Sequence, residues 1–234
     1  MARPVKVADT VEVKYSEKRW ALFKQLRQRA REIMLVLSKH NIGSVVHGSV
    51  ARGDVDENSD VDIFVPSVVP SYRIELALCD AGFHPMKREI VVATPWQLPK
   101  AHVYIEDDRS VTFPLIKPRR LELEFYYFGG AADLQQVERA NRVAGVDKRL
   151  MLIEPTPHGH IESQVMGREA EVAKKVGVSP DIVRERAQVL TRRADIGRTG
   201  VFIERELAPD EAFEVALQRL IKENPELKIR LREK

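Results

Sequence analysis

The sequence predicts an α+β protein in which a small mixed β-sheet is flanked by helices and followed by a mainly helical C-terminal domain. Short β-branched or alternating segments recur through roughly the first 130 residues. After about residue 165, apolar residues instead return at spacings of three and four. Prolines and a glycine cluster at 149–160, so we place domains at 1–150 and 151–234.

A short alternating strand at 11–15 and a long helix open the chain. Ser16 is placed to cap that helix, which we expect to run to about His40. Its apolar stripe consists of Leu22, Leu26, Ala30, Ile33 and Leu37.

Further elements are predicted from β-branched runs, alternation and helical stripes. We expect strands at 44–47, 61–65, 88–94 and 120–128, and helices at 71–81 and 131–148. The segment RLELEFYYF (120–128) alternates between apolar and acidic residues and lies between Pro118 and Gly129-Gly130. Residues 95–118 mix prolines with short strand-like pieces and predict no definite element.

Composition limits the location of the protein and its partners. With 38 basic and 35 acidic residues the net charge is +3, so nucleic-acid affinity would have to come from local basic patches. The single cysteine, Cys79, excludes an internal disulfide, and its apolar surroundings predict a buried thiol. No secretory or membrane-spanning apolar run is recognisable, and we expect a cytoplasmic protein that does not enter a membrane.

Asp60 and Asp62 flank Val61 at the start of a predicted strand. Alternate residues of a strand share a face, so both carboxylates point the same way while Val61 faces the core. Their Cα atoms are roughly 6.5 Å apart. At that spacing two carboxylates can jointly bind divalent ions about 3.5–4 Å from each other.

Glu122 and Glu124 repeat this arrangement on the predicted strand 120–128. If the two acidic strands are neighbours, their carboxylates converge and raise one another's pKa values. Bound Mg²⁺ would remove that conflict, because the ion is doubly charged and prefers oxygen ligands.

The turn at Gly48-Ser49 suits a phosphate group. Gly48 allows the backbone to approach a ligand closely, and a helix beginning near Ser49 would point free N–H groups at an anion. Ser49 adds a hydroxyl donor, and Arg52 adds a positive charge for the same triphosphate.

Together these residues resemble the signature of the DNA polymerase beta-like nucleotidyltransferase superfamily. HGSVARGDVDENSDVDIFV contains Gly48-Ser49, a spacer of ten residues (50–59) and Asp60-Val61-Asp62. The superfamily also has a third carboxylate on a later strand. Because RRLELEF resembles the matching stretch of beta-type polymerases, the resemblance assigns that position to Glu122, with Glu124 as the alternative.

The resemblance covers roughly residues 30–130 and implies a mechanism. Asp60 and Asp62 would bridge two Mg²⁺ ions that hold an NTP such as ATP. Glu122 would help position one ion and lower the pKa of the attacking hydroxyl. Gly48 and Ser49 would hold the β- and γ-phosphates as pyrophosphate leaves. Catalysis of this kind is mainly positioning and charge neutralisation.

Less specific interpretations of these residues remain open. The acidic residues around Asp60 also suit a solvated turn, and Glu122 and Glu124 suit the exposed face of an antiparallel sheet. His158 and His160 lie in a Pro/Gly turn, where surface positions are expected. We expect core packing for Trp96 and for the two consecutive tyrosines Tyr126 and Tyr127.

Residues 167–193 resemble a helix-turn-helix unit. A short amphipathic helix at 169–176 is followed by Gly177 at the turn, and Ser179 caps a second helix that begins at Pro180. The segment 193–206 suits a wing-like hairpin. Residues 184–205 contain six arginines and three acidic residues, a patch suited to RNA or DNA phosphates or, equally, to the solvated face of a helical hairpin.

The sequence therefore predicts a Mg²⁺-dependent nucleotidyltransferase that moves an NMP from an NTP to a hydroxyl acceptor, with a nucleic acid favoured as acceptor by the basic region 184–205. The alternative is an NTP-sensing, nucleic-acid-binding regulator whose nucleotidyltransferase domain is catalytically inactive.

Overall fold

The computed structural model of the chain describes residues 10–197 and 200–232, which form two compact units. Of the described residues, unit 1 comprises 10–31, Val46–Val61 and 123–197, and unit 2 comprises Glu32–Val45, Asp62–Glu122 and 200–232. Both units draw on chain from either side of residue 150, and the linear division 1–150 and 151–234 stays a prediction of the sequence.

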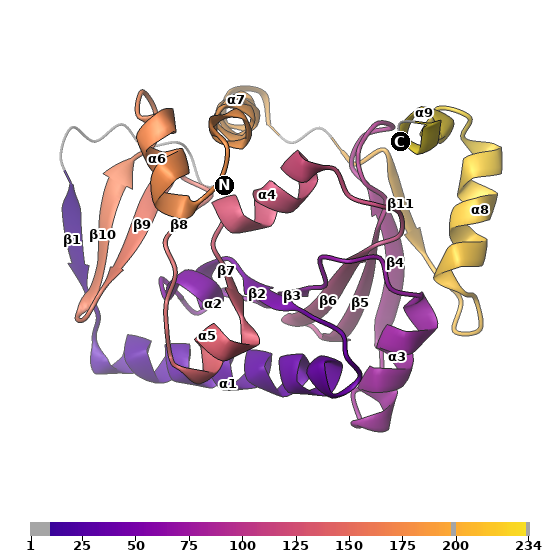
Figure 1. Ribbon diagram of the computed structural model, residues 1–234, viewed down its shortest axis with the longest axis horizontal. Helices are drawn as coiled ribbons and strands as arrows, with labels where there is room; N and C mark the ends of the chain where they lie inside the picture. Colours follow the sequence, from indigo (N-terminus) through magenta and orange to yellow (C-terminus); the bar gives the residue numbers. More distant parts are fainter. Residues whose placement is uncertain (1–9, 198–199, 233–234) are drawn as a thin grey trace. The chain divides into compact units, whose positions relative to one another are not determined.

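Helices and strands together confirm the predicted α+β class (Figure 1). The described helices are α1 (Glu17–Lys39), α2 (Ser49–Arg52), α3 (Ser71–Asp80), α4 (Arg120–Phe128), α5 (Leu134–Glu138), α6 (Glu169–Val176), α7 (Pro180–Ile196), α8 (Phe213–Glu223) and α9 (Leu227–Arg232). The described strands are β1 (Val11–Lys14), β2 (Val45–His47), β3 (Val61–Phe64), β4 (Lys87–Val92), β5 (Lys100–Glu106), β6 (Arg109–Pro114), β7 (Ala131–Asp133), β8 (Gly145–Val146), β9 (Met151–Thr156), β10 (Gly159–Gln164) and β11 (Ile203–Glu206).

Unit 1 contains a four-stranded antiparallel sheet in the order β1-β10-β9-β8, whose strands lie side by side in Figure 1. Strands β9 and β10 form a hairpin, with Met151 opposite Gln164 and Thr156 opposite Gly159. The prolines and glycine that suggest a break at 149–160 lie within this hairpin and its turn, because a tight reversal needs the same residue types as a linker.

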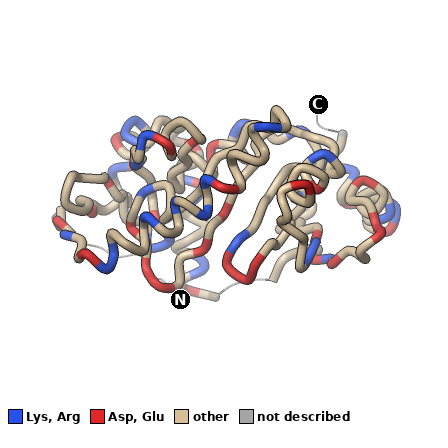
Figure 2. Tube along the Cα trace, turned by 90° about the horizontal axis from the view of Figure 1, so that it is seen from below, with Lys and Arg blue, Asp and Glu red and all other residues tan. Residues whose placement is uncertain are grey.

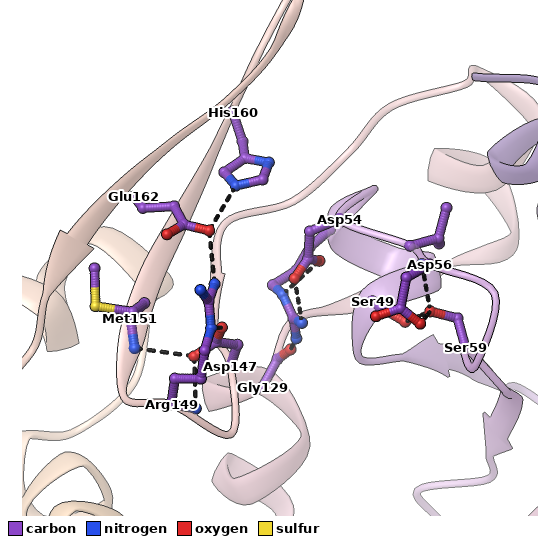
Figure 3. Close-up of polar contacts among 12 residues, drawn as sticks. Ser49, Asp54, Asp56, Ser59, Gly129, Asp147, Arg149, Met151, His160 and Glu162 are labelled. Carbon is purple, nitrogen blue, oxygen red and sulfur yellow. Dashed lines mark hydrogen bonds and ion pairs between the residues drawn. The ribbon is translucent and has the colours of Figure 1, made fainter. Parts of the chain in front are cut away.

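A polar cluster links Tyr15, the residue after β1, to the hairpin, and Figure 3 shows its members His160, Glu162 and Arg149. His160 is only 1% exposed, and its Nδ1 and the Tyr15 hydroxyl are hydrogen-bonded at 2.5 Å. Its Nε2 lies 3.1 Å from Glu162 Oε1, and Glu162 is paired with Arg149 at 2.6 Å. The predicted surface position is therefore wrong for His160, whose neighbour His158 is exposed.

Gly159 lies where β1 approaches the hairpin most closely. A Cβ atom at this position would lie 1.8 Å from the carbonyl oxygen of Val13. We expect Gly159→Ala to lower the free energy of unfolding by at least about 2 kcal/mol, because the backbone of β1 would have to move. Gly43→Ala is the control, since no atom lies within 4 Å of a Cβ built there. Urea denaturation of both variants tests this, and equal stabilities would contradict it.

Unit 2 is built on five strands in the order β11-β4-β5-β6-β3. The pairs β11–β4, β4–β5 and β5–β6 are antiparallel. In the β5–β6 hairpin, Tyr104 lies opposite Ser110 and Lys100 opposite Pro114. Both strands fall within 95–118, where the scattered prolines hide the alternation of the sequence.

Helices α3 and α8 complete the core of unit 2. The ring of Phe113 on β6 meets the ring of Phe213 on α8 edge-on, with centroids 5.4 Å apart. Glu214, the next residue of α8, accepts hydrogen bonds from the backbone N–H and hydroxyl of Ser71 at 2.8 and 2.7 Å. A carboxylate from α8 therefore satisfies the N-terminus of α3.

Strand β11 corrects the wing-like hairpin predicted at 193–206. Helix α7 continues to Ile196, and Ile203–Glu206 pairs with β4, so that Glu206 lies opposite Glu89. Residues 198–199 lie outside the described part of the chain. The segment forms the edge strand of an existing sheet instead of pairing with itself.

The predicted strand 120–128 is wrong, because these residues form helix α4. Arginine, leucine and glutamate are strong helix formers, and over nine residues an alternating pattern does not exclude a helix. In the helix Tyr126 and Phe128 are buried, at 6% and 3% exposure, and Tyr127 is 45% exposed.

The long helix predicted at 131–148 is also wrong. Strand β7, the short helix α5 and strand β8 occupy this stretch. Asp133 and Gln136 form a capping box at the start of α5. Ala140, at φ 57°, follows the helix and reverses the chain.

Cys79 is exposed, which corrects the predicted buried thiol. None of the described helices is both long enough and apolar enough to cross a bilayer.

Candidate active site

The turn after β2 adopts a conformation that requires glycine. Gly48 has φ 77° and ψ −141°, and its N–H donates to the carbonyl oxygen of Gly130 at 2.9 Å. No atom lies within 4 Å of a Cβ built at Gly48. The turn is therefore held through its backbone while open space remains next to it, and helix α2 begins at the following residue, Ser49.

Ser49 connects this turn to the residue that precedes Asp60. Its hydroxyl donates to the Ser59 hydroxyl over 3.1 Å (Figure 3). Ser59 Oγ also accepts the N–H of Asp56 at 2.9 Å, and Asp56 accepts the N–H of Asn58 at 2.9 Å. A compact turn thus fixes the chain before Asp60, whose side chain is exposed. Unit 1 therefore brings the Gly48-Ser49 turn next to the segment that carries Asp60.

Arg52 is buried, at 6% exposure, in a different set of contacts. Its Nε and Nη2 donate to the two carboxylate oxygens of Asp54 at 3.0 and 2.8 Å, and its Nη1 donates to the carbonyl oxygen of Gly129 (Figure 3). This bidentate pair fixes the chain that leaves α2. The phosphate contact expected for Arg52 stays a prediction.

Arg27 on α1 supports α2 and was missed from the sequence. Its guanidinium donates to the carbonyl oxygens of Val50, Ala51 and Asn141 at 2.6, 2.9 and 2.7 Å. Burial, with a smaller contribution from Arg142, lowers the pKa of Arg27 to about 10. The one indication of this role in the sequence is the position of Arg27, which lies next to Leu26 in the apolar stripe of α1.

In unit 2, Asp62 is exposed on β3 while Ile63 and Phe64 are buried. The hydroxyl of Ser110, on the neighbouring strand β6, donates to Asp62 Oδ1 at 3.0 Å. Ser110 is only 6% exposed. The side chain that meets Asp62 from the next strand is therefore a neutral hydroxyl.

Glu122 has positively charged and backbone partners at the start of α4 within unit 2. Its Oε2 accepts from Arg230 at 2.6 Å and from the N–H of Arg119 at 2.7 Å. Arg230 is only 3% exposed and also donates to the carbonyl oxygen of Lys117 at 2.9 Å. Glu122 therefore attaches α9 to the chain that enters α4.

Glu124 has a separate role within unit 1. Its Oε2 accepts from the hydroxyl of Ser179 and, at 3.3 Å, from the backbone N–H of Ser179. Ser179 is the residue before Pro180, where α7 begins. A carboxylate here satisfies the N-terminus of α7 and complements the helix dipole.

The strand positions predicted for Glu122 and Glu124 are wrong, because both residues lie on helix α4. No cluster of three or more His, Cys, Asp or Glu side chains suited to a metal ion occurs among residues 10–197 and 200–232. The catalytic and metal-binding assignments of Asp60, Asp62 and Glu122 stay predictions.

A row of polar residues continues across the sheet of unit 2. The Tyr104 hydroxyl donates to Glu89 Oε1 at 2.6 Å, and Thr112 Oγ1 lies 2.9 Å from His102 Nδ1. Burial and the hydrogen bond to Glu89 raise the pKa of Tyr104 above its ordinary value. Tyr104 therefore remains a protonated hydrogen-bond donor at neutral pH.

The pKa of His102 predicts a pH dependence of stability. Burial, followed by the charge of Lys100, lowers this pKa to about 4, with Lys87 acting in the same direction and Glu89 opposing it. The unfolded chain therefore binds this proton at a higher pH than the folded chain, near 6.5. We expect the free energy of unfolding to fall as pH decreases from about 6.5 to about 4.

Comparison of wild type with His102→Asn isolates this contribution. The variant should lose less stability than wild type between pH 6.5 and pH 4, as measured by urea unfolding at each pH. The exposed His158→Asn should follow the wild-type curve. Parallel curves for wild type and His102→Asn would contradict the assignment.

The two helices of the predicted helix-turn-helix are confirmed, while its binding function stays a prediction. Helices α6 and α7 are joined by a turn in which Gly177 has φ 71°. Basic and acidic residues are interspersed along most of the trace (Figure 2). On α7, Arg186 stacks over the ring of Phe125, and a cavity of about 470 Å³ is lined by Arg184 and Arg192 together with acidic residues.

Of the six arginines of 184–205, three remain on the exposed face of α7. These are Arg184, Arg192 and Arg193. Arg205 belongs to unit 2 and pairs with Glu211 at 2.7 Å, and residue 198 lies outside the described part of the chain. The basic surface of α7 is therefore smaller than the sequence count indicates.

Part of the chain matches a known family model. Residues 27–127 match the family model described as a nucleotidyltransferase domain. No curated protein and no solved structure matches the chain. The matched span contains the turn at Gly48-Ser49 and the strand that carries Asp62.

Proposed function

The chain carries a nucleotidyltransferase domain, consistent with the polymerase beta-like superfamily that its motifs resemble, and on this premise we propose that it transfers an NMP from an NTP to a hydroxyl acceptor. The acceptor oxygen would form a bond to the α-phosphorus as the bond to the pyrophosphate leaving group breaks. The observation that carries the proposal is Asp62, an exposed carboxylate on a strand whose flanking residues, Val61 and Ile63, are fully buried.

Asp60 and Asp62 fit a magnesium site by their chemistry. Both are exposed carboxylates two residues apart, and Mg²⁺ is usually bound through one or two carboxylates together with substrate phosphates. When bound, Mg²⁺ would neutralise charge on the triphosphate. Ser110 would orient Asp62 by donating to one of its oxygens, which leaves the other oxygen available.

The Gly48-Ser49 turn would hold the phosphates of the NTP. Space next to Gly48 and its glycine-specific backbone support this role, and the Ser49 hydroxyl lies beside the turn that precedes Asp60. We assign Arg52 and Arg27 to positioning, because their donors bind protein oxygens around α2. Both arginines would keep the turn in shape without touching substrate.

Ser110 favours a second candidate function, an NTP-binding regulator with little or no turnover. The resemblance implies a third carboxylate on a strand beside the aspartates, and a neutral hydroxyl meets Asp62 from β6. Glu122, the residue expected there, is paired with Arg230. A pair of aspartates is sufficient to bind Mg²⁺ and NTP, whereas activation of the acceptor hydroxyl is the role that a third carboxylate would supply.

Incubation with α-labelled or γ-labelled NTP and Mg²⁺ separates the two functions. The acceptors are RNA, DNA, protein and small hydroxyl compounds, with the α7 arginines as a first candidate contact for nucleic acid. Transfer predicts α-label in the acceptor and γ-label in pyrophosphate. Mg²⁺-dependent NTP binding with no incorporation would support the regulator, and absence of NTP binding would refute both.

Ser110→Asp provides a gain-of-function prediction. A carboxylate at position 110 would add a third negative charge next to Asp62, so we expect Mn²⁺ affinity to rise by about tenfold, the equivalent of ~1.4 kcal/mol. Electron paramagnetic resonance of Mn²⁺ measures this without turnover. Ser110→Asn is the neutral control of similar size, and equal affinities in the two variants would contradict the placement of Ser110 at the metal site.

A further inference from the structure

Two loops of unit 2 meet at one end of its sheet. The first loop, 93–99, connects β4 to β5, and the second, 115–119, follows β6. Lys100 at the start of β5 lies opposite Pro114 at the end of β6, and the N–H of Leu115 donates to the carbonyl oxygen of Pro99 at 3.1 Å. Both loops therefore leave the sheet side by side.

Trp96 lies at the tip of the first loop with 59% of its surface exposed, which corrects the predicted core position. The N–H of Gln97 donates to the carbonyl oxygen of Thr94 at 3.0 Å, which closes the turn that carries it. Arg119 of the second loop donates to the carbonyl oxygen of Trp96 at 3.3 Å. Tryptophan is highly buried on average, so an indole held on a closed turn in solvent is an unusual feature.

The second loop and the first residue of α4 carry positive charge, and Arg119 contacts the backbone of Trp96. Lys117, Arg119 and Arg120 are all exposed, and neither 93–99 nor 115–119 contains an acidic residue. The nearest acidic residue in sequence, Glu122, is neutralised by the buried Arg230. The exposed charge at these loops is thus of one sign.

We propose that Trp96 and the basic residues Lys117, Arg119 and Arg120, here called the Trp96 platform, bind a single-stranded nucleic acid. An exposed aromatic face flanked by cations fits unpaired bases and phosphates, since any base can stack on the indole. Duplex DNA or RNA offers no such base, because its bases are already stacked. Base stacking on the indole and attraction between the cations and the phosphates would account for most of the affinity of the platform for a single strand.

This inference rests on the proposed function where it names the acceptor. Strand β6 joins the platform to Ser110, which contacts Asp62. From Ser110 to Pro114 the strand advances four residues, about 13 Å. A single-stranded nucleic acid stacked on Trp96 would therefore reach the end of β6 near Asp62 within a few nucleotides. We infer that the terminal hydroxyl of this nucleic acid is the acceptor.

Tryptophan fluorescence tests the platform in the full chain. Trp20 is the other tryptophan, so Trp20→Phe leaves Trp96 as the sole indole reporter. A short single-stranded RNA oligonucleotide, added without NTP, should quench this emission. In a separate anisotropy titration with labelled RNA, Trp96→Ala should weaken binding by about tenfold or more, and Trp96→Phe should retain most of the affinity.

Salt dependence separates charge from stacking. Replacement of Lys117, Arg119 and Arg120 by glutamine should reduce the slope of log K against log salt by about 2, since each phosphate contact on a single strand contributes roughly 0.7. Trp96→Ala should leave the slope unchanged. The matched control replaces three exposed lysines elsewhere, Lys24, Lys39 and Lys222, and should have little effect on either quantity.

Three results with nucleic acid would overturn the platform. They are wild-type affinity in Trp96→Ala, equal affinity for a duplex of the same sequence, and loss of binding only when Arg184, Arg192 and Arg193 of α7 are replaced. Tight binding to anionic vesicles without binding to RNA would also refute it. The variant Asp60→Asn with Asp62→Asn should bind RNA normally, so failure of nucleotidyl transfer and failure of the platform give different results.

Discussion

Replacement of both Asp60 and Asp62 by asparagine should lower the rate of metal-dependent nucleotidyl transfer by at least about 10³-fold. The asparagine amide keeps the shape of each side chain but removes the negative charge that would hold Mg²⁺ and the triphosphate. Both side chains are exposed, so the fold should tolerate the change. The rate of incorporation of α-labelled NMP into the acceptor at saturating NTP measures the effect.

Two other exposed acidic residues provide the matched control. Glu57 and Asp107 lie one in each unit, and Glu57→Gln with Asp107→Asn removes the same net charge. This control should transfer at the wild-type rate. Transfer by Asp60→Asn with Asp62→Asn at more than about a tenth of the wild-type rate would show that other groups bind the metal.

Arg52→Met should lower the free energy of unfolding by about 3–5 kcal/mol. The substitution would leave Asp54, whose side chain is only 10% exposed, as a buried charge without its bidentate partner. It would also remove the donor to the carbonyl oxygen of Gly129. Urea denaturation followed by circular dichroism gives the change in stability.

Arg52→Lys and Arg184→Met complete this test. Lysine keeps the positive charge but not the two parallel hydrogen bonds, so the stability of Arg52→Lys should be intermediate. Arg184 is exposed, and Arg184→Met should leave stability within about 0.5 kcal/mol of wild type. An Arg52→Met protein of unchanged stability whose affinity for NTP is reduced would instead support the direct phosphate contact expected from the sequence.

The sequence was sufficient to predict elements whose patterns are local. Helix α1 has a long apolar stripe, and the hydroxyl of Ser16 accepts the N–H of Arg19 at 3.3 Å, as expected of a cap. Strand β3 and the exposure of Asp62 follow from alternation over a short run. The turn at Gly48 is recognisable because its backbone conformation favours glycine.

The third carboxylate shows where local patterns fail. RLELEFYYF suits either a strand or a helix, and only tertiary partners such as Arg230, more than 100 residues later, stabilise the helix. The neighbour of Asp62 depends on the pairing of β6, which the prolines of 95–118 conceal. The sequence therefore does not identify Ser110 as the residue that contacts Asp62.

The burial of Arg27 and Arg52 was also not predicted from the sequence. Arg27 and Arg52 resemble surface cations in composition, yet both are nearly inaccessible, at 7% and 6% exposure. The partners of Arg27 are backbone carbonyl oxygens, which carry no sequence signal, while Arg52 pairs with Asp54 and the carbonyl oxygen of Gly129. Only the position of Arg27 within an apolar stripe indicates its burial.

Mn²⁺ binding in Asp62→Asn and Glu122→Gln tests the assignment of the metal site most directly. Electron paramagnetic resonance with Mn²⁺ and a non-hydrolysable NTP analogue reports bound metal without turnover, and circular dichroism verifies that each variant is folded. We predict that Asp62→Asn loses Mn²⁺ binding and that Glu122→Gln retains it. Retention by Asp62→Asn together with loss by a folded Glu122→Gln would contradict the account and restore Glu122 as a metal ligand.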